Sequence, residues 1–161
     1  MTMLALGHAY TIAELLPHGP GFTLLDSLLD YGHEHASCSI DIGPQTPFFE
    51  AGRGVPNWVG IEYMAQAIGV YAGIVRRQAG QHIEIGLLLG TRRYRCEQAW
   101  FTPGSRLVVR ADQLVRDAAS GVAAFRCQLH DGERELAQAE IKAFQPDNVR
   151  AYLQSLAEGA L

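Results

Sequence analysis

The segment from Trp58 to Val75, WVGIEYMAQAIGVYAGIV, constrains the fold most, because it predicts a helix that is hydrophobic on every side. A membrane span is not favoured, since Glu62, Gln66 and three glycines interrupt the apolar run and no second segment is suited to share a bilayer. Such a helix is stable when the rest of the protein buries it. We therefore expect the chain to build a sheet around it.

The sequence after this segment alternates apolar and polar residues with a period of two, which is typical of half-buried strands. Turn-forming residues at 103–105, 119–121 and 131–133 join the strands as hairpins. An antiparallel sheet around one central helix, an α+β fold, is expected. The apolar faces are Leu107, Val109, Ala111 and Val115; Ala123, Phe125, Cys127 and Leu129; and Ala137, Ala139, Ile141 and Ala143.

Capping residues and helix breakers predict the remaining elements. Thr11 followed by Glu14 indicates a capped helix over residues 11–16, which Pro17 ends. The other expected elements are strands at residues 22–26 and 36–42, the central helix over about 58–77 with Asn57 as N-cap, and a C-terminal helix over about 147–157 with Val149, Leu153 and Leu156 as its apolar stripe.

Length and charge narrow the class of protein. A chain of 161 residues fits a single domain over residues 1–161, and its net charge of -4 argues against a nucleic-acid partner. Cys38, Cys96 and Cys127 are odd in number and lack a CxxC pattern, so neither disulfides nor a metal site are predicted. The N-terminal residues lack a basic region and reach Glu14 too soon for a secretory signal. We expect a cytoplasmic protein without a membrane partner.

Glu62 is the only ionisable carboxylate in the apolar segment. A poorly hydrated carboxylate holds a proton more readily, which suits it for proton transfer at neutral pH. The helix macrodipole also favours a glutamate near a helix start, which would explain the residue without chemistry. Trp58 and Gln66 lie one turn before and after Glu62 on the same face, and we interpret Glu62 as a catalytic acid or base.

Three motifs resemble the bacterial 3-hydroxyacyl-acyl carrier protein dehydratases. LLPHGPGFTLLD at 15–26 is similar to their opening motif, VGIEYMAQAIG at 59–69 to their central-helix motif, and PGSRL at 103–107 to a turn that leads into a strand. The resemblance spans roughly residues 12–145 and implies the hotdog fold. The segments GRGVPNWVGIEYMAQ and GLLLGTRRY resemble still more the branch of predicted dehydratases associated with aryl-polyene biosynthesis.

The resemblance implies dehydration of a 3-hydroxyacyl thioester to the enoyl form in fatty-acid-like or polyene biosynthesis. The substrate would be carried on the phosphopantetheine of acyl carrier protein, and no other cofactor or metal is implied. The family's helix carboxylate falls on Glu62. Counting back from Glu62 without gaps, its catalytic loop histidine falls on Phe48, and Phe49 and Pro56 after it match the loop. Dehydration needs one group to take the α proton and another to protonate the departing hydroxyl. With Phe48 in place of the histidine, no residue is assigned to one of these two steps.

Three explanations stay open: another residue works with Glu62, a partner subunit supplies the group, or the pocket is not catalytic. His18 is a candidate for the first, although the resemblance implies a structural role for it. Phe48, Phe49 and Trp58 are expected to line an apolar acyl slot beside Gln66. Asn57 and the helix N-terminus are expected to offer backbone N–H groups to the thioester carbonyl.

Two kinds of partner are expected. The basic residues Arg92, Arg93 and Arg95 suit the acidic surface of acyl carrier protein, or else form an ordinary solvated strand edge. The central helix has more apolar surface than one sheet need cover, so a homo-oligomer or a heteromer with another hotdog subunit is expected. The alternatives to a dehydratase are a half-catalytic or non-catalytic subunit that completes a heteromeric dehydratase, and an acyl thioesterase.

Overall fold

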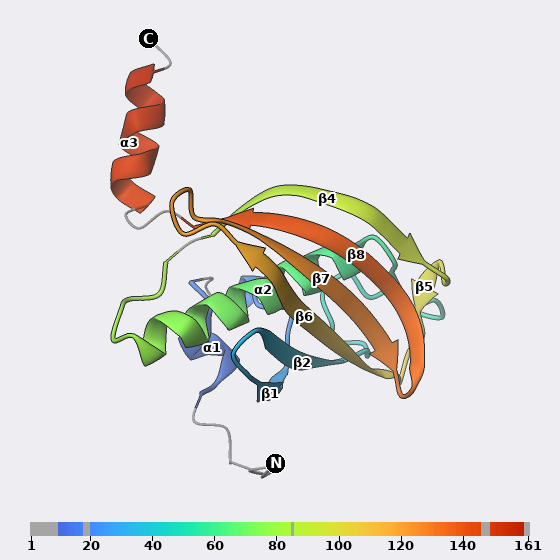
Figure 1. Cartoon of the computed structure of the whole chain (residues 1–161). Coiled ribbons are helices and arrows are strands. Elements are labelled where there is room, and N and C mark those ends of the chain that lie inside the picture. Colours follow the sequence, from blue (N-terminus) through green and yellow to red (C-terminus); the bar gives the residue numbers. More distant parts are fainter. Residues whose placement is uncertain (1–9, 18–19, 85, 146–148, 160–161) are drawn as a thin grey trace.

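One long helix lies inside a curved antiparallel sheet (Figure 1). The computed structural model describes residues 10–17, 20–84, 86–145 and 149–159. The helix is α2, Val59–Gln78. The sheet strands are β1 (Ser27–Tyr31), β2 (His35–Asp41), β4 (Leu87–Cys96), β6 (Arg106–Arg116), β7 (Val122–Asp131) and β8 (Arg134–Phe144), in the spatial order β1-β2-β6-β7-β8-β4.

Shorter elements complete the description. They are α1 (Ile12–Leu15), the 3-10 helix η1 (Pro20–Phe22), the two-stranded sheet of β3 (Val55–Pro56) and β5 (Trp100–Phe101), and α3 (Val149–Gly159). The α3 helix projects from one end of the sheet (Figure 1). Within the described ranges, no helix is long and apolar enough to cross a bilayer.

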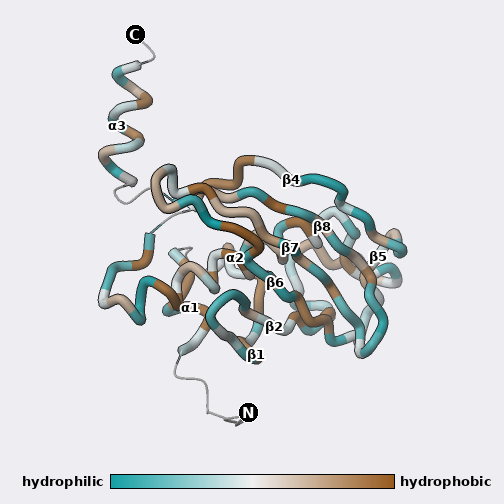
Figure 2. The backbone as a smooth tube through the Cα atoms, viewed as in Figure 1, coloured by the Kyte–Doolittle hydropathy of each residue, from teal (hydrophilic) through white to brown (hydrophobic). Residues whose placement is uncertain are grey.

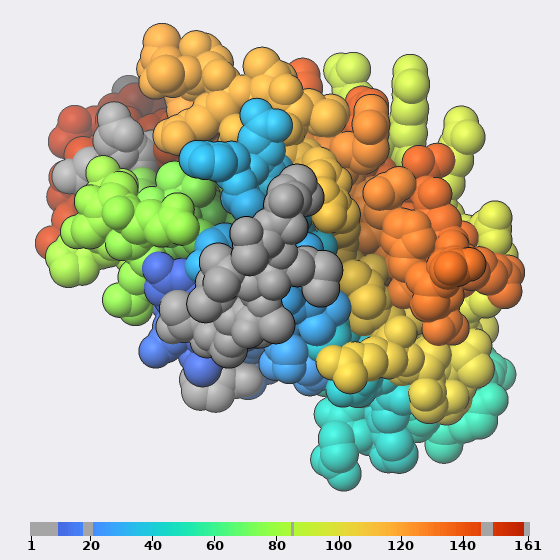
Figure 3. Space-filling model, turned by 60° about the horizontal axis from the view of Figure 1, so that its bottom comes forward, coloured from blue at the N-terminus to red at the C-terminus, as the bar shows by residue number. Residues whose placement is uncertain are grey.

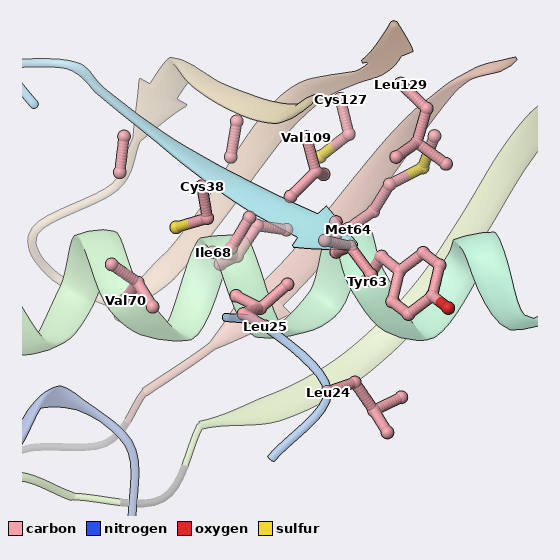
Figure 4. Packing of buried hydrophobic residues seen from close by; sticks show 14 of the residues in the cluster. Leu24, Leu25, Cys38, Tyr63, Met64, Ile68, Val70, Val109, Cys127 and Leu129 are labelled. Carbon is pink, nitrogen blue, oxygen red and sulfur yellow. The ribbon is translucent and has the colours of Figure 1, made fainter. Parts of the chain in front are cut away.

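The inner face of the sheet and α2 form the core. Alternate residues of β6, β7 and β8 are buried, and hydrophobic and hydrophilic stretches alternate along these strands (Figure 2). Cys38, Val109 and Cys127 of the sheet point toward Met64 and Ile68 of α2 (Figure 4). The predicted antiparallel sheet around a central helix is confirmed.

α1 packs closely on α2, and a glycine makes this approach possible. A Cβ atom at Gly73 would collide with the backbone carbonyl of Leu15. The predicted capping pair is present, because the Thr11 backbone N–H donates to the Glu14 carboxylate at 2.8 Å. This short helix therefore closes the side of α2 that faces away from the sheet.

The strand expected at residues 22–26 is wrong: η1 ends at Phe22 and β1 begins only at Ser27. Only Asp26 bonds to a neighbouring strand, through its N–H to the Ser39 carbonyl of β2 at 2.8 Å, while Phe22 and Leu24 bond to a side chain. The Leu24 N–H donates to Gln66 Oε1 at 2.8 Å, and the Phe22 carbonyl accepts from Gln66 Nε2 at 2.9 Å. Leu24 and Leu25 are therefore buried in a loop, whereas Phe22 is 73% exposed.

The assignment of Val115 to the inner face is also wrong. The register between β6 and β7 shifts between Gln113 and Val115, and such a bulge reverses the side of the sheet to which later residues point. Val115 is 62% exposed as a result. In the C-terminal helix, residues 147–148 lie outside the described part, and Leu153 and Leu156 of the expected stripe are about half exposed.

Candidate active site

A groove of about 300 Å³ runs beside α2, between this helix and the ends of four strands, β4, β6, β7 and β8. Its floor contains Glu62, Ala65, Gly69 and Ala72, which are spaced to share one face of the helix. Small side chains at three of these positions leave the space open. This volume is at the lower end of the range for small-molecule sites.

Gln66 holds Glu62 at one end of this groove. The amide is buried, and its Nε2 donates to Glu62 Oε1 at 3.1 Å and to the Phe22 carbonyl at 2.9 Å. Its Oε1 accepts from the Leu24 N–H at 2.8 Å. Since the amide uses both its oxygen and its nitrogen, the orientation of Gln66 is fixed and the Glu62 carboxylate is fixed with it.

Glu62 itself is exposed, so the expectation of a poorly hydrated carboxylate is wrong for the isolated chain. The reason is geometric. The sheet covers one side of α2 and α1 covers part of another, but Glu62 lies at the open side with the groove. Most of the segment is buried as expected, but its sequence does not indicate which side of the helix stays uncovered.

The loop before α2 carries an exposed aromatic pair. Phe48 and Trp58 meet edge to face with ring centroids 5.2 Å apart, and they are 55% and 57% exposed. Phe49 instead packs against the core. None of the three lines the groove in the single chain, so the acyl slot expected of Phe48, Phe49 and Trp58 is not part of this groove and stays a prediction. The loop lies beyond the N-terminus of α2 and forms the blue-green projection in Figure 3.

Phe48 has a left-handed backbone conformation, with φ at +67°. Bulky residues adopt this conformation rarely, and it costs on the order of 1–3 kcal/mol. The strained residue is the one on which the sequence resemblance places a loop histidine. A strained, exposed aromatic residue in a loop is typical of a surface that binds another molecule.

Asn57 has a structural role that the sequence did not indicate. Trp58, and not Asn57, occupies the N-cap position of α2. The Asn57 N–H donates to the Ala99 carbonyl at 3.0 Å, its Nδ2 donates to the Gln98 carbonyl at 2.9 Å, and its carbonyl accepts from the Tyr94 hydroxyl. The backbone N–H of Asn57 therefore has a partner already, and the expected contact of the helix N-terminus with a thioester carbonyl stays a prediction.

Other candidate groups do not join the groove. His18 lies outside the described residues. No group of three or more His, Cys, Asp or Glu residues in the described part is placed to hold a metal ion. Burial raises the pKa of Cys38 and Cys127 to about 12, with smaller contributions from Asp30 and Asp112 respectively, so both remain protonated core thiols. They do not serve as nucleophiles.

The far end of the groove contains residues that sequence reasoning missed. Gln113 and Arg116 come from the end of β6, Gln145 follows β8, and Glu84 precedes β4. The Gln145 Nε2 donates to the Glu84 carbonyl at 3.1 Å and so joins two loops. No local pattern could have grouped these residues, because the sheet alone brings their strand ends together.

Residues 10–154 match the sequence profile of the ApeP-like family, described as ApeP dehydratase. The chain belongs to this family. ApeP-like proteins are dehydratases by this description, so the resemblance found in the motifs is confirmed. Among proteins with curated functions, none matches the chain in sequence.

Solved structures share the fold of this chain. A chain of the dehydratase heterocomplex ApeI:P from Xenorhabdus doucetiae is 28% identical with a TM-score of 0.84, over 92% of this chain and 99% of that one. The Escherichia coli PaaI protein from the phenylacetic acid degradation operon is 8% identical with a TM-score of 0.57, over 73% and 81% of the two chains. A hypothetical thioesterase from Streptococcus pneumoniae, solved with coenzyme A, is 11% identical with a TM-score of 0.56, over 73% and 83%. The ApeP-like chain has the hotdog fold.

Proposed function

We propose that this chain dehydrates a 3-hydroxyacyl thioester carried on acyl carrier protein, with Glu62 as one of two proton-transfer groups. The observation that carries the proposal is the Gln66 hydrogen bond, which holds the Glu62 carboxylate at one end of the groove along α2. The ApeP-like family membership supports dehydration over hydrolysis.

A second hotdog subunit supplies the other proton-transfer group. In the described part of this chain no histidine lines the groove, and Phe48 stands where the resemblance to the 3-hydroxyacyl-acyl carrier protein dehydratases places their loop histidine. The Xenorhabdus relative is described as a heterocomplex of dehydratase subunits, which supports a similar arrangement here. The chain then contributes a carboxylate, and the partner contributes an imidazole.

The surface along the groove suits such a partner. Leu88 and Leu89 of the edge strand β4 are 49% and 54% exposed, and Phe48 and Trp58 are exposed at the other end of α2. An unpaired strand edge and exposed large apolar side chains favour association with another protein. A subunit placed over this surface would cover the groove and exclude water from Glu62.

The proton transfers follow from this desolvation. Water excluded from a carboxyl group favours its protonated form, so Glu62 donates its proton to the departing hydroxyl while the imidazole takes the α proton. The C–O bond breaks, the α carbon and β carbon form a double bond, and one water molecule leaves. The proton that the imidazole has taken restores Glu62 in the next cycle.

Acyl carrier protein is the proposed carrier because β4 is basic along its second half. Arg92, Arg93 and Arg95 are all exposed, and the side chains of β4 stand out at the edge of the molecule (Figure 3). A register shift between Arg92 and Arg95, with Arg93 at a φ of +55°, breaks the alternation that would otherwise separate them. The phosphopantetheine phosphate and the acidic carrier surface complement this charge.

The test compares the purified chain alone with the chain purified together with a second hotdog subunit from the same source. Both are given a 3-hydroxyacyl thioester of acyl carrier protein, and the products are identified by mass. Enoyl product from the two-subunit sample alone supports the proposal in full. Enoyl product from the single chain removes the need for a partner, and free thiol without enoyl product indicates a thioesterase instead.

A further inference from the structure

The groove is polar at the end opposite Glu62. From Glu62 to Val75 the helix rises 1.5 Å per residue, so the groove extends for about 20 Å along α2. Between these two ends, the small side chains of Ala65, Gly69 and Ala72 leave the groove open and make it apolar. An acyl chain attached to a thioester at Glu62 would therefore bring its other end to this polar region.

Arg116 is the charged donor at this end. It is the last residue of β6, and the turn after it is fixed because the Asp117 N–H donates to the Val122 carbonyl at 2.9 Å. Burial raises the pKa of Tyr71, Glu34 adds to the rise, and the positive charge of Arg116 opposes it, which places the guanidinium close to this groove residue.

The donors of Arg116 are available to a ligand. Its guanidinium carries five N–H donors and no acceptor. Among the described residues it forms no hydrogen bond or ion pair, whereas the Gln145 amide beside it already donates to the Glu84 carbonyl. Arg116 is thus the charged group at this end that can still donate to a bound molecule, beside the neutral amide of Gln113.

We propose that Arg116 makes the groove selective for acyl chains whose distal end carries a hydrogen-bond acceptor, such as a hydroxyl or carbonyl oxygen. The inference rests on the proposed function. The Arg116 side chain is exposed in the isolated chain, and an acyl chain that ends in a methyl group would displace water from the guanidinium and offer no acceptor in return. A chain that ends in an oxygen restores the lost hydrogen bond, which is how a site distinguishes molecules of equal length.

The experiment uses two pairs of 3-hydroxyacyl thioesters on acyl carrier protein. In the long pair the acyl chain reaches Arg116 and ends in either a hydroxyl or a methyl group; in the short pair it cannot reach. The wild-type chain, in the assembly that is active, should favour the long hydroxyl substrate in kcat/KM by about tenfold. The short pair should show no preference for the hydroxyl.

Arg116→Met should reduce that preference to within about twofold, and Arg116→Lys should retain part of it. Arg126→Met is the matched control, because Arg126 is an exposed arginine of β7 that does not line the groove, and it should keep the wild-type preference. A preference that survives Arg116→Met, or that is absent from the wild type, overturns the inference while dehydration stands. Failure of every assembly to form enoyl product overturns the proposed function itself.

Discussion

The Gln66 amide donates to Glu62 Oε1 at 3.1 Å while the same amide binds the backbone of residues 22–24. One buried side chain thus connects the proposed catalytic carboxylate to the loop that precedes β1. Gln66 is a positioning residue in this arrangement. Its substitution should affect the site and the fold through separate contacts.

Replacing Gln66 with leucine should lower both stability and activity. The Leu24 N–H and the Phe22 carbonyl lose their partner, and the free energy of unfolding should fall by roughly 1–3 kcal/mol. Misplacement of Glu62 should lower kcat on the order of 10- to 100-fold with a smaller change in KM. Gln78→Leu, at the exposed end of α2, is the control for both denaturation and steady-state measurements. Unchanged kcat in Gln66→Leu would show that Glu62 does not need this bond.

Glu62→Gln should separate chemistry from stability. Because Glu62 is exposed in the isolated chain, the free energy of unfolding should stay within about 0.5 kcal/mol. Enoyl formation should fall more than about 100-fold, since the amide cannot donate a carboxyl proton. Glu133→Gln, in the exposed turn between β7 and β8, should leave activity unchanged. If the variant keeps activity within about tenfold of the wild type, which corresponds to about 1.4 kcal/mol of activation free energy, Glu62 is not a proton-transfer group.

The sequence predicts the sheet and the central helix because both depend on short-range periodicity. The burial of Cys127 and Leu129, for example, follows from alternation alone. The expected burial of Val115 is wrong because strand pairing determines where a bulge forms. No residue type in this segment indicates the bulge.

The site was only partly predictable for a similar reason. Glu62 and Gln66 share a helix face, so their contact follows from spacing. Arg116 and Gln145 come together only because two strand ends meet beside α2, which is a property of the folded sheet. The exposure of Glu62 depends on which side of the helix the chain leaves uncovered.

Gly73→Ala should loosen the contact between α1 and α2. The added methyl group would collide with the backbone of Leu15, which cannot rotate away as a side chain can. The free energy of unfolding should fall by roughly 1–3 kcal/mol in urea denaturation. Gly43→Ala is the matched control, because a Cβ atom there meets nothing within 4 Å. Equal stability of the two variants would show that α1 does not pack on α2 in solution.

Alkaline pH should destabilise the protein through its buried thiols. Burial raises the pKa of Cys38 and Cys127 from 9.0 to about 12, so the unfolded chain loses these protons first as the pH rises. The stabilising contribution is complete below pH 9 and is lost progressively up to about pH 12. Urea midpoints across this range measure the effect, and Cys38→Ala should flatten the decline. If the urea midpoint of the double variant Cys38→Ala, Cys127→Ala falls with pH as steeply as that of the wild type, the loss of stability does not come from these thiols.

Phe48→Gly should cost little stability in the isolated chain. Glycine accepts a φ of +67° without strain, and this relief offsets most of the lost contact with the Trp58 ring, so the free energy of unfolding should change by less than about 1 kcal/mol. Phe49→Gly is the comparison, because Phe49 packs against the core, and it should lose more than about 2 kcal/mol.

The same Phe48→Gly variant should weaken assembly with the second hotdog subunit. The exposed ring gives the partner an apolar anchor beside Trp58, and its removal should raise the Kd at least about tenfold in sedimentation or titration experiments. A variant that is stable alone and impaired only in assembly would show why a strained aromatic residue is kept at this position. An unchanged Kd, with Phe48→Gly as unstable as Phe49→Gly, would make Phe48 an ordinary part of the core and remove the loop from the proposed interface.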